Sequence, residues 1–231
     1  MGEYQSIAVD EGTFRAYVAR PSVALAPAVV VIQEIFGVNA DMRETCDELA
    51  ERGFIAIAPD LFWRKEPGLD LNSWSEADWK KGLALYAEYD RDAGIRDIAA
   101  TAGVAKRIDG SSGKVGVMGF CLGGLMSFLT TARTDIDVGV SYYGGGTDQV
   151  LDEVPALTAP FQIHLAEEDE FISKPAQEKI KMALSGKPNV ELYSYPGCNH
   201  AFARHTGTHY DRKAAATANE RTRAFLVKHL S

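Results

Sequence analysis

The sequence predicts an α/β fold, in which a mostly parallel, twisted β-sheet carries helices on both faces. Apolar runs of strand length alternate along the chain with amphipathic stretches of helix length, which is typical of repeated strand–helix units. Several runs, such as residues 28–32, are continuously apolar, so both faces of these strands should be buried. In such a sheet the ligand site lies at the carboxyl ends of the strands.

Strands and helices can be assigned along most of the chain. Asp41, followed by Glu44 three residues later, resembles a capping box at the start of the first helix. The sequence shows no internal repeat and no low-complexity linker, so residues 1–231 are expected to form a single domain. We expect strands at 28–32, 54–58, 115–118, 138–142, 161–165 and 190–195, and helices at 41–52, 93–107, 125–132, 174–184 and 212–230.

Composition and charge narrow the classes of partner. The formal net charge is −8 and no basic cluster stands out, which argues against a nucleic-acid partner. No apolar run approaches the ~18 residues that a membrane span needs. The chain starts with a polar segment rather than a signal peptide, and its 3 cysteines are an odd number. We therefore expect a cytoplasmic protein with free thiols that acts on a small molecule.

The most informative motif is Gly-Phe-Cys-Leu-Gly at residues 119–123. It follows the apolar run 115–118 and precedes the expected helix 125–132. A nucleophile at the apex of a sharp strand-to-helix turn, with glycine two residues to either side, is the nucleophile elbow of the α/β-hydrolase fold. The apex backbone is strained, and both glycines let the strand and the helix approach closely. The motif thus predicts Cys121 as a nucleophile, and the alternative is a buried cysteine in a turn.

An acid and a base are expected on loops that follow later strands. A cysteine nucleophile needs a base, and the base needs an orienting carboxylate; in α/β-hydrolases the acid precedes the histidine. Asp169 follows the strand 161–165 and His200 follows the strand 190–195, so we predict a triad of Cys121, His200 and Asp169. The other candidates are expected to be structural or solvated: His164, His205, His209, His229, Glu167, Glu168, Glu170, Cys46 and Cys198.

Two backbone N–H groups are needed to stabilise the oxyanion of an acyl-transfer reaction. Leu122, the residue after the nucleophile, should supply one, and Ile35, in the loop after the strand 28–32, the other. Glu34 beside this loop is unusual, because a carboxylate opposes the charge that develops there. We consider two roles for Glu34: a gate that accepts or holds the Cys121 proton, and a carboxylate that faces solvent or bonds a neighbouring backbone group.

Residues 62–92 differ in character from the rest of the chain. The segment is rich in tryptophan, tyrosine, lysine and acidic residues, and it stands as an insertion before a helix. We expect it to cover the site, and the alternative is a surface helix with buried aromatic side chains.

Along nearly its whole length the chain resembles the dienelactone hydrolase family. The matching segments are 33–39, 42–44, 58–61, 119–124, 142–144, 200–204 and 218–221, together with Asp169. The resemblance implies hydrolysis of the ring ester of carboxymethylenebutenolides to maleylacetate, in the catabolism of catechols and chlorocatechols, without a cofactor or a metal. It maps the family's triad onto Cys121, Asp169 and His200, and its gating glutamate onto Glu34.

The resemblance also suggests substrate contacts. Two arginines hold the substrate carboxylate in the best-known family members; Arg204 matches one of them, and Trp79 stands at the position of the other. Lys80 or Lys81 is a candidate replacement, as a point charge without the planar fork of arginine. Alternatively the second anchor is absent and Trp79 favours a less polar substrate. Phe36 and Tyr142 complete the expected substrate contacts.

The expected function is therefore the opening of an anionic lactone or ester through a thioester on Cys121. A broader carboxylesterase or thioesterase that acts on neutral esters is the main alternative. A remote one, from another class, is a non-catalytic redox sensor in which Cys121 is oxidised. We expect a monomer rather than an oligomer.

Overall fold

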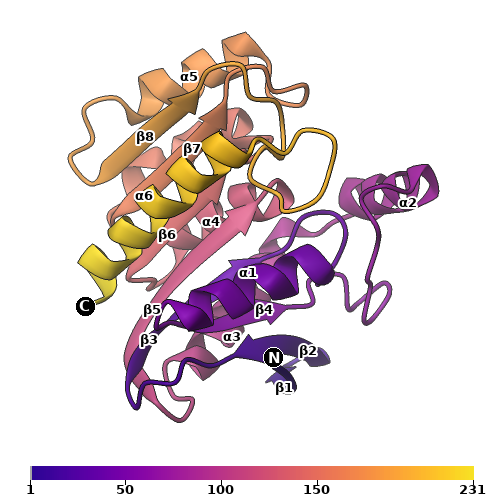
Figure 1. The fold of residues 1–231 in the computed structure, drawn as a ribbon, viewed down its shortest axis with the longest axis vertical. Coiled ribbons are helices and arrows are strands. Elements are labelled where there is room, and N and C mark those ends of the chain that lie inside the picture. The colour runs from indigo at the N-terminus through magenta and orange to yellow at the C-terminus, as the bar shows by residue number, and fades with distance from the viewer. Residues whose placement is uncertain (1) are drawn as a thin grey trace.

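An eight-stranded sheet forms the centre of the fold (Figure 1). The computed structural model describes residues 2–231, and the strands lie in the order β1-β2-β4-β3-β5-β6-β7-β8. All neighbours from β4 to β8 in this order pair in parallel, which confirms the prediction of a mostly parallel sheet. The strands are β1 (Glu3–Val9), β2 (Gly12–Ala19), β3 (Ala26–Ile32), β4 (Ile55–Pro59), β5 (Ser111–Phe120), β6 (Val138–Tyr142), β7 (Phe161–Ala166) and β8 (Val190–Tyr195).

Helices cover both faces of this sheet. In Figure 1, α1 and α6 lie in front of the strands, whereas α3 and α4 lie behind them. The helix α2 stands apart from the sheet, on the side of the loop between β8 and α6. The helices are α1 (Ala40–Glu51), α2 (Glu76–Ala87), α3 (Arg91–Ala105), α4 (Leu122–Arg133), α5 (Lys174–Leu184) and α6 (Arg212–Leu230), with the short 3-10 helices η1 (Thr147–Gln149) and η2 (Leu151–Ala156).

The N-terminal hairpin was not predicted from the sequence. β1 and β2 pair antiparallel from Glu3 to Val18, and β2 continues antiparallel onto β4. As an edge strand, β1 buries only Ile7, so its apolar signal is weak. The alternation of polar and apolar residues, interrupted by Asp10 and Glu11, was the available signal for a hairpin.

The start of α1 differs from the predicted capping box. The N-cap is Asn39, whose side-chain oxygen accepts a hydrogen bond from the backbone N–H of Met42 at 3.2 Å. The Asp41 carboxylate instead accepts hydrogen bonds from the backbone N–H and the hydroxyl of Thr206, at 3.0 to 3.1 Å. Asp41 thus links α1 to the loop that follows β8. Local capping patterns do not predict such a long-range contact.

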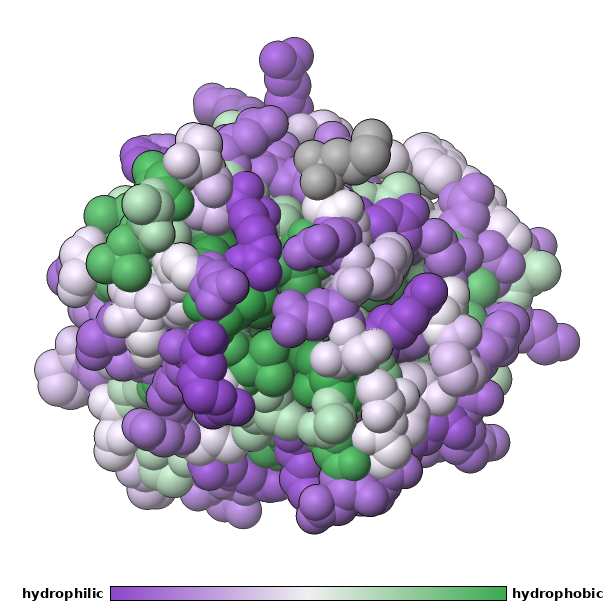
Figure 2. Space-filling view, turned by 90° about the horizontal axis from the view of Figure 1, so that it is seen from below, coloured by the Kyte–Doolittle hydropathy of each residue, from purple (hydrophilic) through white to green (hydrophobic). Residues whose placement is uncertain are grey.

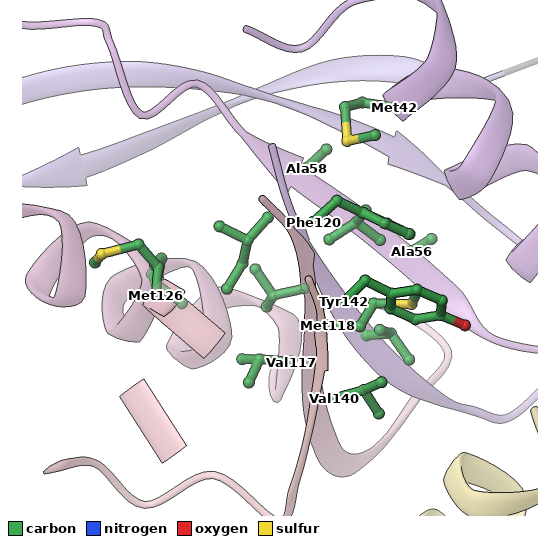
Figure 3. Close-up of a cluster of buried hydrophobic side chains, with 14 of the residues drawn as sticks. Met42, Ala56, Ala58, Val117, Met118, Phe120, Met126, Val140 and Tyr142 are labelled. Carbon is green, nitrogen blue, oxygen red and sulfur yellow. The ribbon is translucent and has the colours of Figure 1, made fainter. Parts of the chain in front are cut away.

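Successive side chains along the central strands point to opposite faces of the sheet, so they contribute to two separate cores. Figure 3 shows Val117 and Met126 on one side of the strands, and Met118, Phe120 and Tyr142 on the other. All five side chains are at most 4% exposed. This burial on both faces explains the continuously apolar runs in the sequence.

One face of the molecule is mostly hydrophilic (Figure 2). Figure 2 shows one face, on which hydrophobic side chains occupy only part of the surface between larger hydrophilic areas. Among residues 2–231, none of the helices combines the length and the apolar character that crossing a membrane requires.

A fully buried histidine lies in the core between the sheet and α6. His164 Nδ1 lies 2.8 Å from the Tyr195 hydroxyl, and Nε2 lies 2.9 Å from the Gln162 side-chain oxygen and 3.0 Å from the Thr222 hydroxyl. Burial, with a smaller contribution from the positive charge of Arg221, lowers the pKa of His164 to about 3. His164 is therefore a neutral core residue, as its position within a strand suggested.

This histidine predicts a loss of stability in mild acid. The pKa of His164 is lower in the folded state than the ordinary value near 6.5 in the unfolded state, so its contribution is present above about pH 6.5 and is lost as the pH falls towards 3. We expect the free energy of unfolding to fall by about 1.4 kcal/mol per pH unit in this window because of His164 alone. Urea titrations of the wild type and His164→Gln between pH 4.5 and 7.5 test this. A slope with pH that is identical in both proteins would contradict it.

Candidate active site

The elbow at Cys121 has the strained backbone that the motif predicts. Cys121 has φ 55° and ψ −115° at the junction of β5 and α4, and it is partly exposed. A Cβ atom at Gly119 would lie 2.0 Å from the Gly123 carbonyl oxygen, and one at Gly123 would lie 2.2 Å from the Ile32 carbonyl oxygen. Neither position tolerates a side chain, which confirms the predicted reason for both glycines. This geometry pushes the sulfur out of the sheet edge.

A buried pair of Asp169 and His200 stands on the loops after β7 and β8. His200 Nδ1 lies 3.0 and 2.9 Å from the two carboxylate oxygens of Asp169. The carboxylate also accepts hydrogen bonds from the backbone N–H groups of Phe171 and Ile172, at 2.8 and 3.1 Å. Because a carboxylate only accepts, Nδ1 carries a proton in this pair. Asp169 thus fixes the orientation of the ring.

The surroundings of His200 leave its second nitrogen available. The ring is 2% exposed and lies edge-on to Tyr143 and Phe171, with centroids 5.0 and 4.8 Å away. Among residues 2–231, its Nε2 has no hydrogen-bond partner. Burial lowers the pKa of His200, but the negative charge of a Cys121 thiolate and the hydrogen bond to Asp169 outweigh burial and raise it. Nε2 is thus the ring nitrogen that is available for proton transfer.

The backbone around the elbow offers free N–H groups. Ile32 at the end of β3 pairs with Gly119 of β5, so the loop that follows β3 runs beside the elbow. Leu122 is the first residue of α4, and its N–H has no partner within the helix. Within residues 2–231, the backbone N–H groups of Ile35 and Leu122 donate no hydrogen bond. The two groups proposed for an oxyanion hole are thus unpaired.

A buried ion pair lies next to the elbow. Arg204 Nε donates a hydrogen bond to Glu34 Oε2 at 2.7 Å, and both side chains are at most 5% exposed. The second oxygen of Glu34 is buried and has no partner in the described part of the chain. The Arg204 guanidinium carbon lies 5.1 Å above the Phe36 ring. Burial lowers the pKa of Arg204, but the neighbouring Glu34 carboxylate more than offsets this effect and raises it.

A cleft open to solvent reaches His200 and Arg204. Trp79 of α2 stacks on Phe171 with ring centroids 6.3 Å apart, and its indole N–H donates to the Ser73 carbonyl oxygen at 2.7 Å. Residues 62–92 therefore contribute one wall of this cleft. Its lining consists of Ser73, Trp79, Glu170, Phe171, His200, Ala201, Arg204, Gly207, Thr208 and His209.

Four candidate substrate contacts lie outside the cleft lining. Tyr142 points to the α1 and α6 side of the sheet (Figure 3), where its hydroxyl contacts Asn219 and Thr222 at 3.0 and 2.7 Å. Lys80 is exposed and is not part of the cleft lining. Lys81 forms an ion pair with Glu66 at 2.6 Å. Phe36 is buried behind Trp79 and Arg204, so it supports these side chains rather than lining the cleft.

The structure also adds residues that the sequence did not single out. Tyr143 has φ 38°, which turns the residue after β6 towards the site; its buried hydroxyl has no partner among residues 2–231. Burial and then the Glu34 charge keep the pKa of Tyr143 well above its ordinary value. Phe171 was detectable in principle, because it follows Asp169 by two residues on the same loop. Of the rival histidines, His205 pairs with Glu48 at 3.2 Å, and His229 packs on Phe225.

Comparison with known proteins gives consistent matches over nearly the whole chain. The sequence profile of the dienelactone hydrolase family matches residues 14–230. A putative carboxymethylenebutenolidase of Azospirillum brasilense is 43% identical over 223 residues, which cover 96% of either chain. The carboxymethylenebutenolidase of Pseudomonas putida is 39% identical over 94% of this chain and 92% of its own. The crystal structure of a putative dienelactone hydrolase from Klebsiella pneumoniae is similar with a TM-score of 0.87, at 27% identity, over 99% of this chain and 98% of its own.

Proposed function

Because this chain belongs to the dienelactone hydrolase family and is a carboxylic ester hydrolase, we propose that it opens the ring ester of carboxymethylenebutenolide to maleylacetate. The observation that carries this proposal is that Cys121 lies close enough for its charge to act on both His200 and the buried Arg204, while His200 pairs with Asp169 and both His200 and Arg204 line one cleft. The curated relatives named above are carboxymethylenebutenolidases, which supports the substrate. The fold by itself licenses no particular substrate.

The first half of the reaction forms a thioester. The Cys121 thiolate attacks the lactone carbonyl carbon, and the carbonyl oxygen takes up the negative charge. The free N–H groups of Ile35 and Leu122 stabilise this oxyanion. When the ring C–O bond breaks, the electron pair leaves with the enolate oxygen. An enolate is a good leaving group and needs little help from an acid, and it takes a proton to become the ketone of the product.

The second half hydrolyses the thioester. His200 Nε2 removes a proton from a water molecule, and the oxygen attacks the thioester carbonyl carbon. The C–S bond then breaks, the thiolate of Cys121 is restored, and the new carboxylic acid is released. Asp169 keeps the ring oriented and stabilises the imidazolium.

Glu34 and Arg204 are proposed to link substrate binding to this chemistry. In the free enzyme Arg204 holds Glu34 in a buried ion pair. A substrate carboxylate competes with Glu34 for Arg204, because a guanidinium binds carboxylates strongly. The released Glu34 then takes the proton of the Cys121 thiol, so that the thiolate forms when substrate is bound.

This role of Arg204 predicts a preference for substrates with a free carboxylate. We expect wild-type kcat/KM to be higher for carboxymethylenebutenolide than for its methyl ester, and Arg204→Gln to lower the value for the acid about ten- to a hundredfold. Arg204→Lys keeps a charge opposite Glu34 and should recover part of the preference. Arg204→Lys is also a control for misfolding. Arg204→Gln leaves the Glu34 carboxylate buried without a partner, which destabilises the fold, whereas Arg204→Lys keeps a positive charge beside it. Equal wild-type values for acid and methyl ester would contradict the proposal.

A broader esterase on neutral substrates is the second candidate. One observation favours it: among the described lining residues no lysine and no second arginine accompanies Arg204, and Trp79 and Phe171 form an aromatic part of the lining. Such aromatic walls suit apolar acyl or alcohol groups. In this case neutral aryl acetates would match or exceed the carboxylated lactone in kcat/KM, and Arg204→Lys would leave the aryl acetates unaffected.

A further inference from the structure

The helix α2 touches the loop after β3 through a glycine. Gly82 is the one residue of α2 that is classed as buried. A Cβ atom at this position would lie 2.7 Å from the Ile35 carbonyl oxygen and 3.2 Å from the Ile35 side-chain atoms Cγ1 and Cδ1. The first of these distances is shorter than any van der Waals contact, so the helix lies directly on the Ile35 backbone.

The contact, and not the backbone conformation, requires glycine here. Gly82 does not belong to the glycines with positive φ, so an L-residue fits its backbone. A glycine in the middle of a helix costs about 0.5–1 kcal/mol relative to alanine. The close approach to Ile35 gives a structural reason for glycine despite this cost.

Ile35 depends on this contact more than its neighbours do. Gln33 is held by its side chain, whose oxygen accepts a hydrogen bond from the Leu61 N–H at 3.0 Å. Phe36 is held by its carbonyl oxygen, which accepts from the Leu71 N–H at 2.9 Å. Between them, the Ile35 carbonyl accepts no hydrogen bond from any of residues 2–231. Packing against Gly82, together with burial of the Ile35 side chain, therefore holds the middle of the loop.

The same helix also reaches the substrate cleft. Trp79 precedes Gly82 by three residues and thus lies on the same face of α2. Its ring lines the cleft and contacts Phe36 edge-on, with centroids 4.9 Å apart. One helix face thus touches both the cleft and the loop that carries the Ile35 N–H.

We propose that Gly82 is a positioning residue, which lets α2 hold the Ile35 N–H in place for the oxyanion. The inference rests on the proposed function, in which Ile35 supplies one of the two oxyanion donors. A side chain at position 82 would push the Ile35 peptide away or lift α2 from the loop. In either case the Ile35 N–H loses its fixed direction, whereas the Cys121–His200–Asp169 geometry on the other loops is retained.

The test compares Gly82→Ala with Gly103→Ala. Gly103 lies within α3, and a Cβ there would approach only the Arg107 guanidinium nitrogens, at 3.7 Å; this substitution therefore removes a helical glycine without a clash. For each protein we would measure acylation by p-nitrophenyl acetate, as the burst of p-nitrophenol, and alkylation of Cys121 by iodoacetamide. Acylation passes through an oxyanion, whereas alkylation is a direct displacement that does not.

We expect Gly82→Ala to slow acylation about ten- to a hundredfold, because loss of one oxyanion donor costs about 10²–10³ and displacement is a partial loss. Alkylation should stay within about twofold of the wild type in both variants, and Gly103→Ala should not alter acylation. Unchanged acylation in Gly82→Ala, or an equal fall in acylation and alkylation, would overturn the inference.

Two further measurements keep the result interpretable. Should Gly82→Ala fail to fold, Ile35→Val removes the Cδ1 atom that faces Gly82 and should also slow acylation more than alkylation; equal effects on both would overturn the inference. Wild-type protein that does not turn over carboxymethylenebutenolide would instead count against the proposed function.

Discussion

Replacement of Cys121 by alanine is expected to lower kcat/KM for carboxymethylenebutenolide by about 10⁴-fold or more. Removal of the nucleophile of a catalytic triad has effects of this size, because the remaining groups cannot form the covalent intermediate. The rate of lactone opening, followed by its ultraviolet absorbance, measures the loss. Cys121→Ser should also be severely impaired at neutral pH, since a hydroxyl ionises far less readily than a thiol.

The other thiols provide a matched control. Burial raises the pKa of Cys46 far above its ordinary value, and burial also raises that of Cys198, so neither is a ready nucleophile. Cys198→Ala should keep wild-type kcat within about threefold. Activity of Cys121→Ala close to that of the wild type would rule out the proposed nucleophile.

The second large effect is expected for His200→Gln. Its kcat should fall about 10²–10⁴-fold, the range usual for loss of a general base. Thioester hydrolysis needs a base for water, while ring opening expels a good leaving group. We therefore expect an initial burst of lactone opening, of about one equivalent per active site, followed by very slow turnover. Stopped-flow absorbance separates the two phases.

His205→Gln is the control for this prediction. His205 follows the same strand, but its ring faces Glu48 of α1 instead of the cleft. We expect its kcat to remain within about threefold of the wild type. Full steady-state activity of His200→Gln would show that another group activates the water.

The local sequence predicted the parts of this site that follow strand ends. Gly119 and Gly123 are required by close backbone contacts, so their spacing around Cys121 carries information that is independent of distant residues. Asp169 and His200 were found because loops after parallel strands meet at one edge of the sheet. These assignments needed only the strand positions and the order of the residues.

Side-chain direction was harder to predict at the ends of elements. Tyr142 is the last residue of β6 and faces the α6 side, whereas Tyr143, with its positive φ, belongs to the site. The two adjacent tyrosines give no indication in the sequence of which one is the last residue of the strand. Lys80 is a different case, because each residue of a helix turns by about 100°; with Trp79 in the cleft, Lys80 has to point away from it.

Long-range contacts were not predictable at all from local patterns. The Asp41 side chain was expected to cap α1 and instead contacts Thr206, which is 165 residues away. Likewise, nothing near Gly82 in the sequence indicates that it packs on Ile35. Such pairs are determined by how whole elements pack.

The most direct test of the proposed mechanism is mass spectrometry of His200→Gln quenched during its reaction with carboxymethylenebutenolide. We expect a mass increase equal to one whole lactone, since ring opening leaves the enolate portion attached to the acyl group. Proteolysis should place this adduct on the peptide that contains Cys121. Turnover with Cys121 unmodified throughout, or an adduct on a different residue, would contradict a thioester mechanism at this site.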